Sequence, residues 1–242
     1  EMNASLTSLT GLSGLTSLGG LSVNTNGSLT SLAGLTALTS IDGSVSLSTG
    51  NAFTTLVGLE GITSISGSLS ISNEALIDLN GLTGLTSIGR DLTITGDSLT
   101  SLAALSNLSS IGEDLQVIGS DALTTLSGLH GISYVPGNLH VEYNDLLTSL
   151  EGLHNISLVD GNVGVSENPG IANFYGLRGL RSMGGNLRVA CNENLTDIRD
   201  IQFSTFSGQI SQCGNAGTVG TQLWDLCRIQ WATLCTYTGC HC

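Results

Sequence analysis

The stretch Leu29–Ser48 reads LTSLAGLTALTSIDGSVSLS, and a second stretch that opens at Phe53, FTTLVGLEGITSISGSLSIS, repeats it closely. Both consist mainly of Leu, Thr, Ser, Gly and Ile. The pattern recurs every 23 or 24 residues, with coil starts at Leu6, Leu29, Phe53, Leu76, Leu99, Leu123, Leu147, Ile171 and Leu195. Such a regular repeat predicts a solenoid, in which each coil packs only on its neighbours.

Apolar residues stand at fixed offsets within each coil, at 0, 3, 6, 9, 12, about 16 and about 18 residues from its start. The last of these columns is mostly β-branched and alternates with polar residues, which is typical of a strand. A Gly that recurs inside the L-x-x-L-x-x-L segment favours a tight corner over a helix. We therefore predict an all-β fold, a β-solenoid of about eight to nine coils around a Leu, Ile and Val core. Eight coils at about 4.8 Å per strand make a body about 40 Å long.

The consensus L-T-S-L-x-G-L-x-x-L-T-S-I-x-G-x-L-x-I resembles the repeat of the receptor L-domain family, the leucine-rich β-solenoid of insulin and epidermal-growth-factor receptor ectodomains. Related repeats occur in fungal cell-wall glycoproteins and in secreted surface proteins of single-celled eukaryotes. The resemblance covers about residues 5–206 and includes CNENLTDIRDIQF, Cys191 to Phe203, which is similar to the family's closing segment. Phe203 stands where a Trp is usual, and the chain has more coils than a receptor L-domain. The resemblance implies a secreted or cell-surface protein.

The end of the chain differs in composition from the repeat. We expect a leucine-rich solenoid over residues 1–206 and a small cysteine-rich cap over residues 207–242, because a terminal coil needs a cover for its core and strand edge. Trp224, Cys227, Trp231 and Cys235 have helical spacing, which predicts one short helix in this cap. At the other end, residues 1–5 are too few to cover the consensus coil that begins at Leu6. We expect a neighbouring molecule or a further segment to cover it.

All six cysteines follow residue 190, and this even number predicts a disulfide-bonded terminus made in an oxidising compartment. They are Cys191, Cys213, Cys227, Cys235, Cys240 and Cys242. Cys191 and Cys213 occupy comparable places in adjacent coils, and a rise of about 4.8 Å suits the Cα separation of about 4.4–6.8 Å in a disulfide. We predict that these two pair with each other, and the pairing of the other four stays open.

Five Asn-x-Ser/Thr sequons add to the case for secretion. They lie at Asn3, Asn26, Asn107, Asn155 and Asn194. Together with the cysteines they predict an extracellular glycoprotein, either secreted or held at the cell surface.

The charge of the chain excludes some partners. Its net charge is −13, with six Arg and no Lys, which argues against nucleic acid because such binding requires cations that neutralise phosphates. It also argues against docking on an anionic membrane surface. The chain contains no run of 18 apolar residues, so direct insertion into a membrane is not expected.

No motif in the sequence indicates catalysis. His130 and His154 share a coil position, but no further metal ligand repeats beside them. His140 and Glu142 lie close together on an outward strand face rather than in a cleft. We expect no enzyme activity, no cofactor and no metal.

The candidate binding face consists of two outward ranks of threonine. One rank is Thr7, Thr30, Thr54, Thr100, Thr124 and Thr148, and the other is Thr16, Thr39, Thr63 and Thr86. A third rank, on the clearest strand, is Ser22, Ser46, Ser70 and Thr93. Thr and Ser are also simply soluble strand residues, and repeat duplication alone would leave such ranks.

Three functions fit these observations. The first is a non-enzymatic structural or adhesive module that binds proteins, including other copies of itself, in an extracellular filament or matrix. The second is ice binding through flat Ser/Thr ladders, whose strand spacing of about 4.7 Å is similar to repeats in the ice lattice. The third is a receptor ectodomain fragment or a carbohydrate-binding module.

Overall fold

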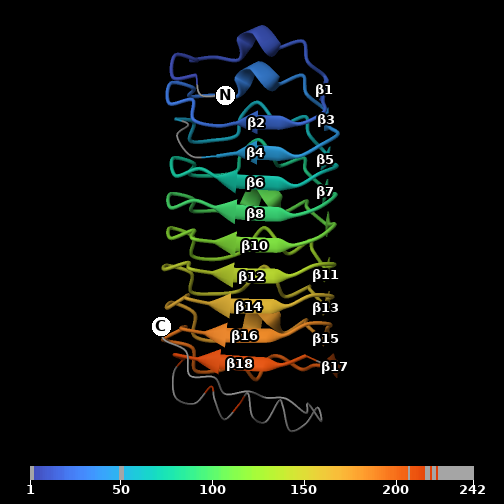
Figure 1. The fold of residues 1–242 in the computed structure, drawn as a ribbon, viewed down its shortest axis with the longest axis vertical. Coiled ribbons are helices and arrows are strands. Elements are labelled where there is room, and N and C mark those ends of the chain that lie inside the picture. The colour runs from blue at the N-terminus through green and yellow to red at the C-terminus, as the bar shows by residue number, and fades with distance from the viewer. Residues whose placement is uncertain (1–2, 49–51, 207, 216–218, 220–221, 223–242) are drawn as a thin grey trace.

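A computed structural model describes residues 3–48, 52–206, 208–215, 219 and 222, and it shows the expected all-β solenoid. The coils stack along one axis and form three parallel sheets (Figure 1). The largest sheet has nine strands, one from each coil. These strands are β2 (Leu21–Val23), β4 (Val45–Leu47), β6 (Leu69–Ser72), β8 (Leu92–Thr95), β10 (Leu115–Ile118), β12 (Leu139–Glu142), β14 (Val163–Ser166), β16 (Leu187–Ala190) and β18 (Ile210–Cys213).

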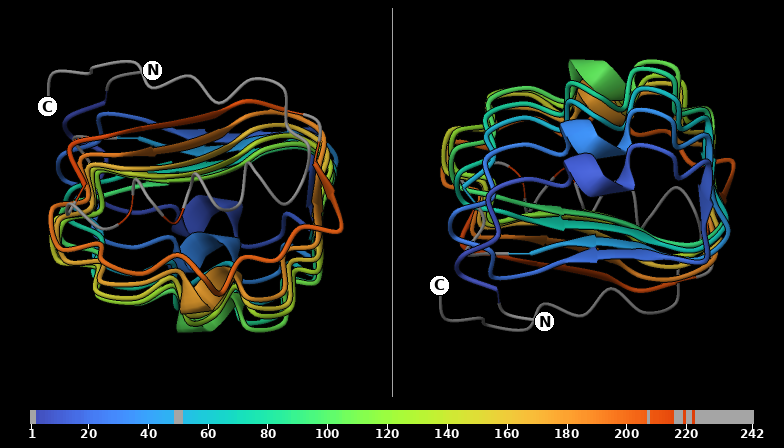
Figure 2. Two further views of the ribbon diagram at one scale, coloured as in Figure 1. Left: turned by 90° about the horizontal axis from the view of Figure 1, so that it is seen from below. Right: turned by 90° about the horizontal axis from the view of Figure 1, so that it is seen from above.

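Two-residue strands form a second side of the solenoid, in two sheets. The five-stranded sheet contains β1 (Ser17–Leu18), β3 (Ser40–Ile41), β5 (Ser64–Ile65), β7 (Ser87–Ile88) and β9 (Ser110–Ile111). The four-stranded sheet contains β11 (Tyr134–Val135), β13 (Leu158–Val159), β15 (Ser182–Met183) and β17 (Thr205–Phe206). The L-x-x-L-x-x-L segments form turns on the remaining long side, opposite the nine-stranded sheet (Figure 2). Four of these turns are 3-10 helices, η1 (Thr10–Leu12), η2 (Ala33–Leu35), η3 (Ala103–Leu105) and η4 (Tyr175–Leu177).

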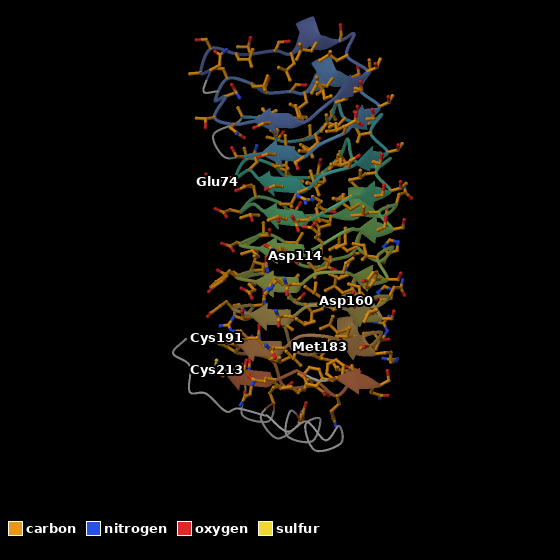
Figure 3. The ribbon with its side chains drawn as sticks, turned by 45° about the vertical axis from the view of Figure 1, so that its right-hand side comes forward. Glu74, Asp114, Asp160, Met183, Cys191 and Cys213 are labelled. Carbon is orange, nitrogen blue, oxygen red and sulfur yellow. The ribbon has the colours of Figure 1, made fainter. Side chains whose placement is uncertain are left out.

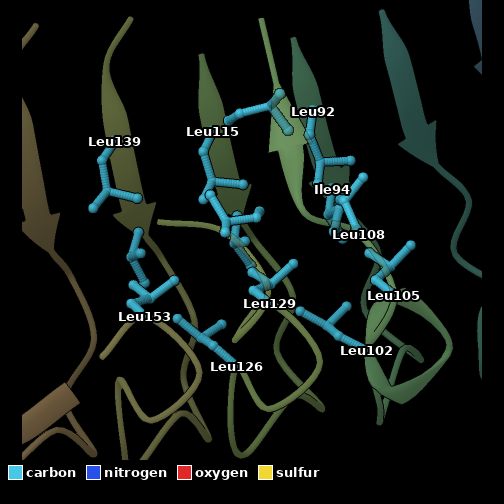
Figure 4. Packing of buried hydrophobic residues seen from close by; sticks show 14 of the residues in the cluster. Leu92, Ile94, Leu102, Leu105, Leu108, Leu115, Leu126, Leu129, Leu139 and Leu153 are labelled. Atoms are coloured by element: carbon cyan, nitrogen blue, oxygen red, sulfur yellow. The ribbon is translucent and has the colours of Figure 1, made fainter. Parts of the chain in front are cut away.

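The predicted apolar columns form the core. Leu92, Leu115 and Leu139 point inward from neighbouring strands and meet leucines of the turn side such as Leu105 and Leu129 (Figure 4). All five side chains are fully buried. A single coil has no neighbouring coil to cover its apolar residues. The core therefore forms only because the repeated coils stack on one another.

Proline explains why the short strands are divided into two sheets. In several coils the residue after the short strand donates its N–H to the strand of the preceding coil, as Gly89 does to Ile65 and Asp160 does to Val135. The residue after β11 is Pro136, which has no N–H to donate. The five-stranded sheet therefore ends at β9, while the nine-stranded sheet continues past this level.

A ladder of asparagines, which we did not predict, lies at the corner between the main strands and the next coil. Asn144, Asn168 and Asn192 are fully buried. Each donates from Nδ2 to a strand carbonyl of the preceding coil, as Asn168 does to Val141 at 2.8 Å. Each side-chain Oδ1 accepts the backbone N–H of the ladder residue in the preceding coil. The ladder thus satisfies polar backbone groups that the corner would otherwise bury without partners.

The solenoid extends past residue 206, where we placed its boundary. Strand β18 pairs with β16, and Asn215 adds a further member to the asparagine ladder. Most of the predicted cap, including its helix, Trp224, Trp231 and the last four cysteines, lies outside the described residues. Val219 is fully buried in the core cluster, and the Gln222 side chain bonds the backbone N–H of Ile198 and the carbonyl of Thr196.

Cys191 and Cys213 lie at neighbouring levels on one side of the solenoid (Figure 3). Both are buried and both are disulfide-bonded. The strand register places Cys213 beside Ala190, and the backbone N–H of Cys191 donates to the Cys213 carbonyl at 2.7 Å. Their pairing with each other stays a prediction.

Candidate functional site

Within the described residues, no coil covers the outer end of the first coil, where part of the hydrophobic core is exposed. A pocket of about 470 Å³ opens there. Its apolar lining comes mainly from six leucines of that coil, Leu6, Leu9, Leu12, Leu15, Leu18 and Leu21. Leu12 is 41% exposed, whereas Leu35, one coil further along the solenoid, is fully buried. The difference arises because Leu35 has a described coil on both sides. We call this surface the first-coil end.

The polar edge of the first coil is open as well. β2 is the last strand of the nine-stranded sheet and, among the described residues, pairs only with β4, through residues such as Leu21, whose N–H donates to the Ser44 carbonyl. A parallel strand directs alternate backbone groups to its two sides, so Ser22 presents its N–H and carbonyl to the open edge. An unpaired edge beside exposed leucines is a template for strand addition.

The first-coil end is also electrically neutral. From residue 3 to residue 41 the sequence contains no Asp, Glu, Lys, Arg or His. The chain as a whole carries −13. The first-coil end therefore combines exposed apolar area with an absence of charge, which is typical of the centre of a protein interface.

The outer face of the nine-stranded sheet carries a second regular surface. Ser22, Ser46, Ser70 and Thr93 lie side by side in the strand register and form one rank. A second rank on the same face, which we had not recognised from the sequence, contains Ser72 beside Thr95. Asn24 and Ser48 continue it, joined by a 2.8 Å side-chain hydrogen bond. We call these two ranks the hydroxyl face.

Most hydroxyls of this face are available to solvent. Among the described residues, the side chains of Ser46, Ser70, Ser72, Thr93 and Thr95 form no protein hydrogen bond, and each is partly exposed. No charged residue belongs to either rank over these four coils. The hydroxyl face is therefore a neutral array of donors and acceptors repeated at the strand spacing of about 4.8 Å.

The same two ranks become charged in later coils. His140 and Glu142 follow on β12, and Arg188 lies on β16. His140 Nδ1 lies 3.1 Å from Glu142 Oε1, and Arg188 donates to the Ser166 hydroxyl at 2.7 Å. Gly164 lies between them, and a Cβ at this position would come within 2.8 Å of both His140 and Glu142. The hydrogen bond from His140, aided by the charges of His140 and Arg188, lowers the pKa of Glu142 despite its partial burial. The charged side chains of this cluster therefore interact with one another.

The two predicted threonine ranks lie elsewhere. Thr30 and the other members of the first rank are exposed on the turn side, and Thr16, Thr39, Thr63 and Thr86 immediately precede the short strands. Several of their hydroxyls donate to the carbonyl of the preceding coil, including Thr39 to Thr16 at 3.0 Å and Thr148 to Thr124 at 3.2 Å. These hydroxyl protons form hydrogen bonds between coils, so they are less available to donate to a ligand.

Other exposed polar groups occur around η4. Arg178 stacks over the Tyr175 ring at 4.0 Å and donates to Glu151 at 2.9 Å. The hydrogen bond from Arg178 is the main cause of a lowered pKa at Glu151. Arg199 lowers the pKa of Asp197 to about 2 in the same way. These pairs neutralise each other at the surface.

The sequons differ in accessibility. Asn3, Asn107, Asn155 and Asn194 are exposed. Asn26 is only 5% exposed, and its Nδ2 donates to the Asn24 carbonyl at 2.9 Å. The structure thus leaves room for a glycan at four of the five positions and disfavours one at Asn26, which takes a corner position equivalent to the asparagine ladder.

In the part of the chain that the structure describes, no group of three or more His, Cys, Asp or Glu side chains is arranged to hold a metal ion. None of its helices has the length and apolar character that crossing a bilayer requires. Comparisons with protein-family models, with curated proteins and with solved structures found no match.

Proposed function

We propose that this protein is a non-enzymatic extracellular module whose role is structural or adhesive, and that it works by protein–protein contact at the first-coil end. The observation that carries the proposal is the leucine-lined pocket of about 470 Å³ beside the unpaired edge of β2. Internal coils bury the equivalent leucines completely. The resemblance to receptor L-domains, the sequons and the cysteines support an extracellular location.

The energetics favour a covered end. Burying one leucine side chain is worth about 1.5–3 kcal/mol, and six leucines line the pocket. Pairing the edge of β2 would also satisfy backbone groups that otherwise depend on water. A partner that supplies an apolar surface and a strand edge gains both contributions.

Protein isolated from its natural source tests this proposal. We expect electron microscopy to show assemblies in which the first-coil end contacts another protein surface. Substituting Leu12 with Arg should release the partner, whereas Leu146→Arg should not, because Leu146 is 58% exposed at a corner five coils away from η1. Isolated particles with an uncovered first-coil end would contradict the proposal.

The hydroxyl face favours a second candidate function, binding to ice. A flat, neutral sheet with unpaired hydroxyls at a spacing of about 4.8 Å can order water in a repeating array. This candidate differs from the sequence-based one in its residues, because the face is formed by Ser46, Ser70, Ser72, Thr93 and Thr95 rather than by the two predicted threonine ranks.

A further inference from the structure

We propose that the partner of the first-coil end is the first-coil end of a second copy, so that two molecules pair head to head. This inference rests on the proposed function, since it names the occupant of the same surface. It is carried by the shape and charge of the two ends of the solenoid.

Charge favours a copy of the same surface. Two identical acidic proteins repel each other at most orientations, because the chain carries −13. The first-coil end is an exception, since residues 3–41 contain no charged group and Asp42 in the second coil is the first acid beyond them. Two copies of this surface can approach without placing like charges opposite each other.

Among the described residues, the opposite end of the solenoid leaves no matching surface open. Val219 already packs into the core cluster there, and Gln222 already bonds the backbone N–H of Ile198. A head-to-tail filament would have to displace these described residues. The first-coil end of another copy needs no such displacement.

Head-to-head contact has a defined geometry. A two-fold axis perpendicular to the nine-stranded sheet would place β2 antiparallel to β2 of the partner, at about 4.8 Å, and the two sheets would become continuous. Ser22 is the central residue of β2 and would lie near the axis. The six leucines of each end would cover those of the other. Such an interface closes on itself and produces a dimer rather than a fibre.

A single cysteine near the axis tests the orientation. We expect Ser22→Cys to give a covalent dimer on a non-reducing gel after mild oxidation, because directly opposed residues of antiparallel strands meet the Cα separation of a disulfide. The matched control is Ser211→Cys on β18 at the other end. A cross-link in a mixture of the two variants, but not in Ser22→Cys alone, would show head-to-tail contact and overturn the proposal.

Sedimentation of the unmodified chain tests the association itself. We expect a concentration-dependent dimer that Leu12→Arg weakens at least tenfold and that Leu146→Arg leaves unchanged. Ser22→Pro provides a second variant, since it removes only the outward N–H of an edge strand and retains the leucines. Circular dichroism would establish that each variant folds.

A monomer at all concentrations would overturn head-to-head pairing, as would a further coil found by mass spectrometry before residue 1 in protein from the source. The proposed function would survive a monomer if a different protein binds the first-coil end, whereas a further coil of the same chain in that place would refute both proposals.

Discussion

The Oδ1 atom of Asn168 accepts two hydrogen bonds from Asn144, one from its backbone N–H at 3.2 Å and one from its Nδ2 at 2.9 Å. The Asn168 Nδ2 in turn donates to the carbonyls of Val141 and Ser166. The same Nδ2 also lies 3.3 Å from the Asn192 Oδ1 of the following coil, so one buried side chain joins three successive coils. Satisfied buried networks of this kind specify a single register, because a slipped coil would leave several polar groups without partners.

We predict that Asn168→Ala destabilises the protein by about 3 kcal/mol or more, since each buried polar group left unpaired costs about 1–3 kcal/mol. Asn168→Ser should cost less, because Ser120 already occupies this column and the corner accommodates it. Thermal unfolding with intact disulfides measures both variants. Equal melting temperatures for wild type and Asn168→Ala would show that the ladder has no stabilising role.

The assignment of inward and outward residues can be tested in one coil. Leu126→Ala should cost about 2–5 kcal/mol because it leaves a cavity in the core. Thr124→Leu should fold normally, since Thr124 is exposed and its side chain is not needed for the bond that its carbonyl accepts from Thr148. Similar losses of thermal stability in both variants would refute the assignment.

Glu142 should make stability depend on pH. Its folded-state pKa is lowered, chiefly by the His140 hydrogen bond, so its contribution is fully present above the unfolded-state pKa of about 4.3 and is lost as pH falls through the folded-state value. Glu142→Gln should therefore destabilise the protein by about 1–2 kcal/mol at pH 6 and by progressively less below pH 4. Glu113→Gln is the control, because Glu113 forms only an exposed pair with Arg90. A penalty for Glu142→Gln that does not change between pH 6 and pH 3 would contradict this account.

The ice candidate predicts thermal hysteresis and shaped ice crystals at micromolar concentration. Ser70→Tyr combined with Thr93→Tyr should abolish both effects, because the rings would break the flatness of the hydroxyl face. Thr30→Tyr combined with Thr54→Tyr should leave them intact, because these residues lie on the turn side. Round ice discs grown with the unmodified protein would eliminate ice binding.

Peptide mapping under non-reducing conditions tests the disulfide between Cys191 and Cys213. Both residues are oxidised and their backbones share a hydrogen bond, but the register places Cys213 beside Ala190. We expect one linked peptide that contains both cysteines. A peptide that links Cys191 to Cys240 or Cys242 instead would disprove the pairing.

The repeat was sufficient to predict the solenoid because apolar periodicity determines which residues point inward. The columns that include Leu126 and Val141 were assigned to the core, and both residues are fully buried there. The asparagine ladder was missed, although Asn144, Asn168 and Asn192 have the period of the repeat. Polar residues at a corner usually face water, and only the three-dimensional structure shows that these asparagine side chains turn inward.

The candidate surfaces were harder to predict from the sequence. The ranks that contain Thr39 and Thr148 are the most regular in the sequence. The sequence pattern does not reveal that the hydroxyls of these two residues donate to backbone carbonyls of the preceding coil. Ser72 and Thr95 were overlooked because their rank is less uniform, and their place on the nine-stranded sheet depends on strand register.

The proline after β11 has a mechanical consequence. Near this level Pro136 interrupts the short-strand side, and the corner column has Gly96 and Ser120 in place of asparagine. The nine-stranded sheet and the apolar core continue past this level, and the corner that leads into the sheet is held by the Gly137 N–H, which donates to the Glu113 carbonyl. The solenoid is therefore a rod with a built-in flexure point, stiff on the sheet side and compliant on the other. Under load it would bend there first, with the coils before Pro136 moving against the coils after it.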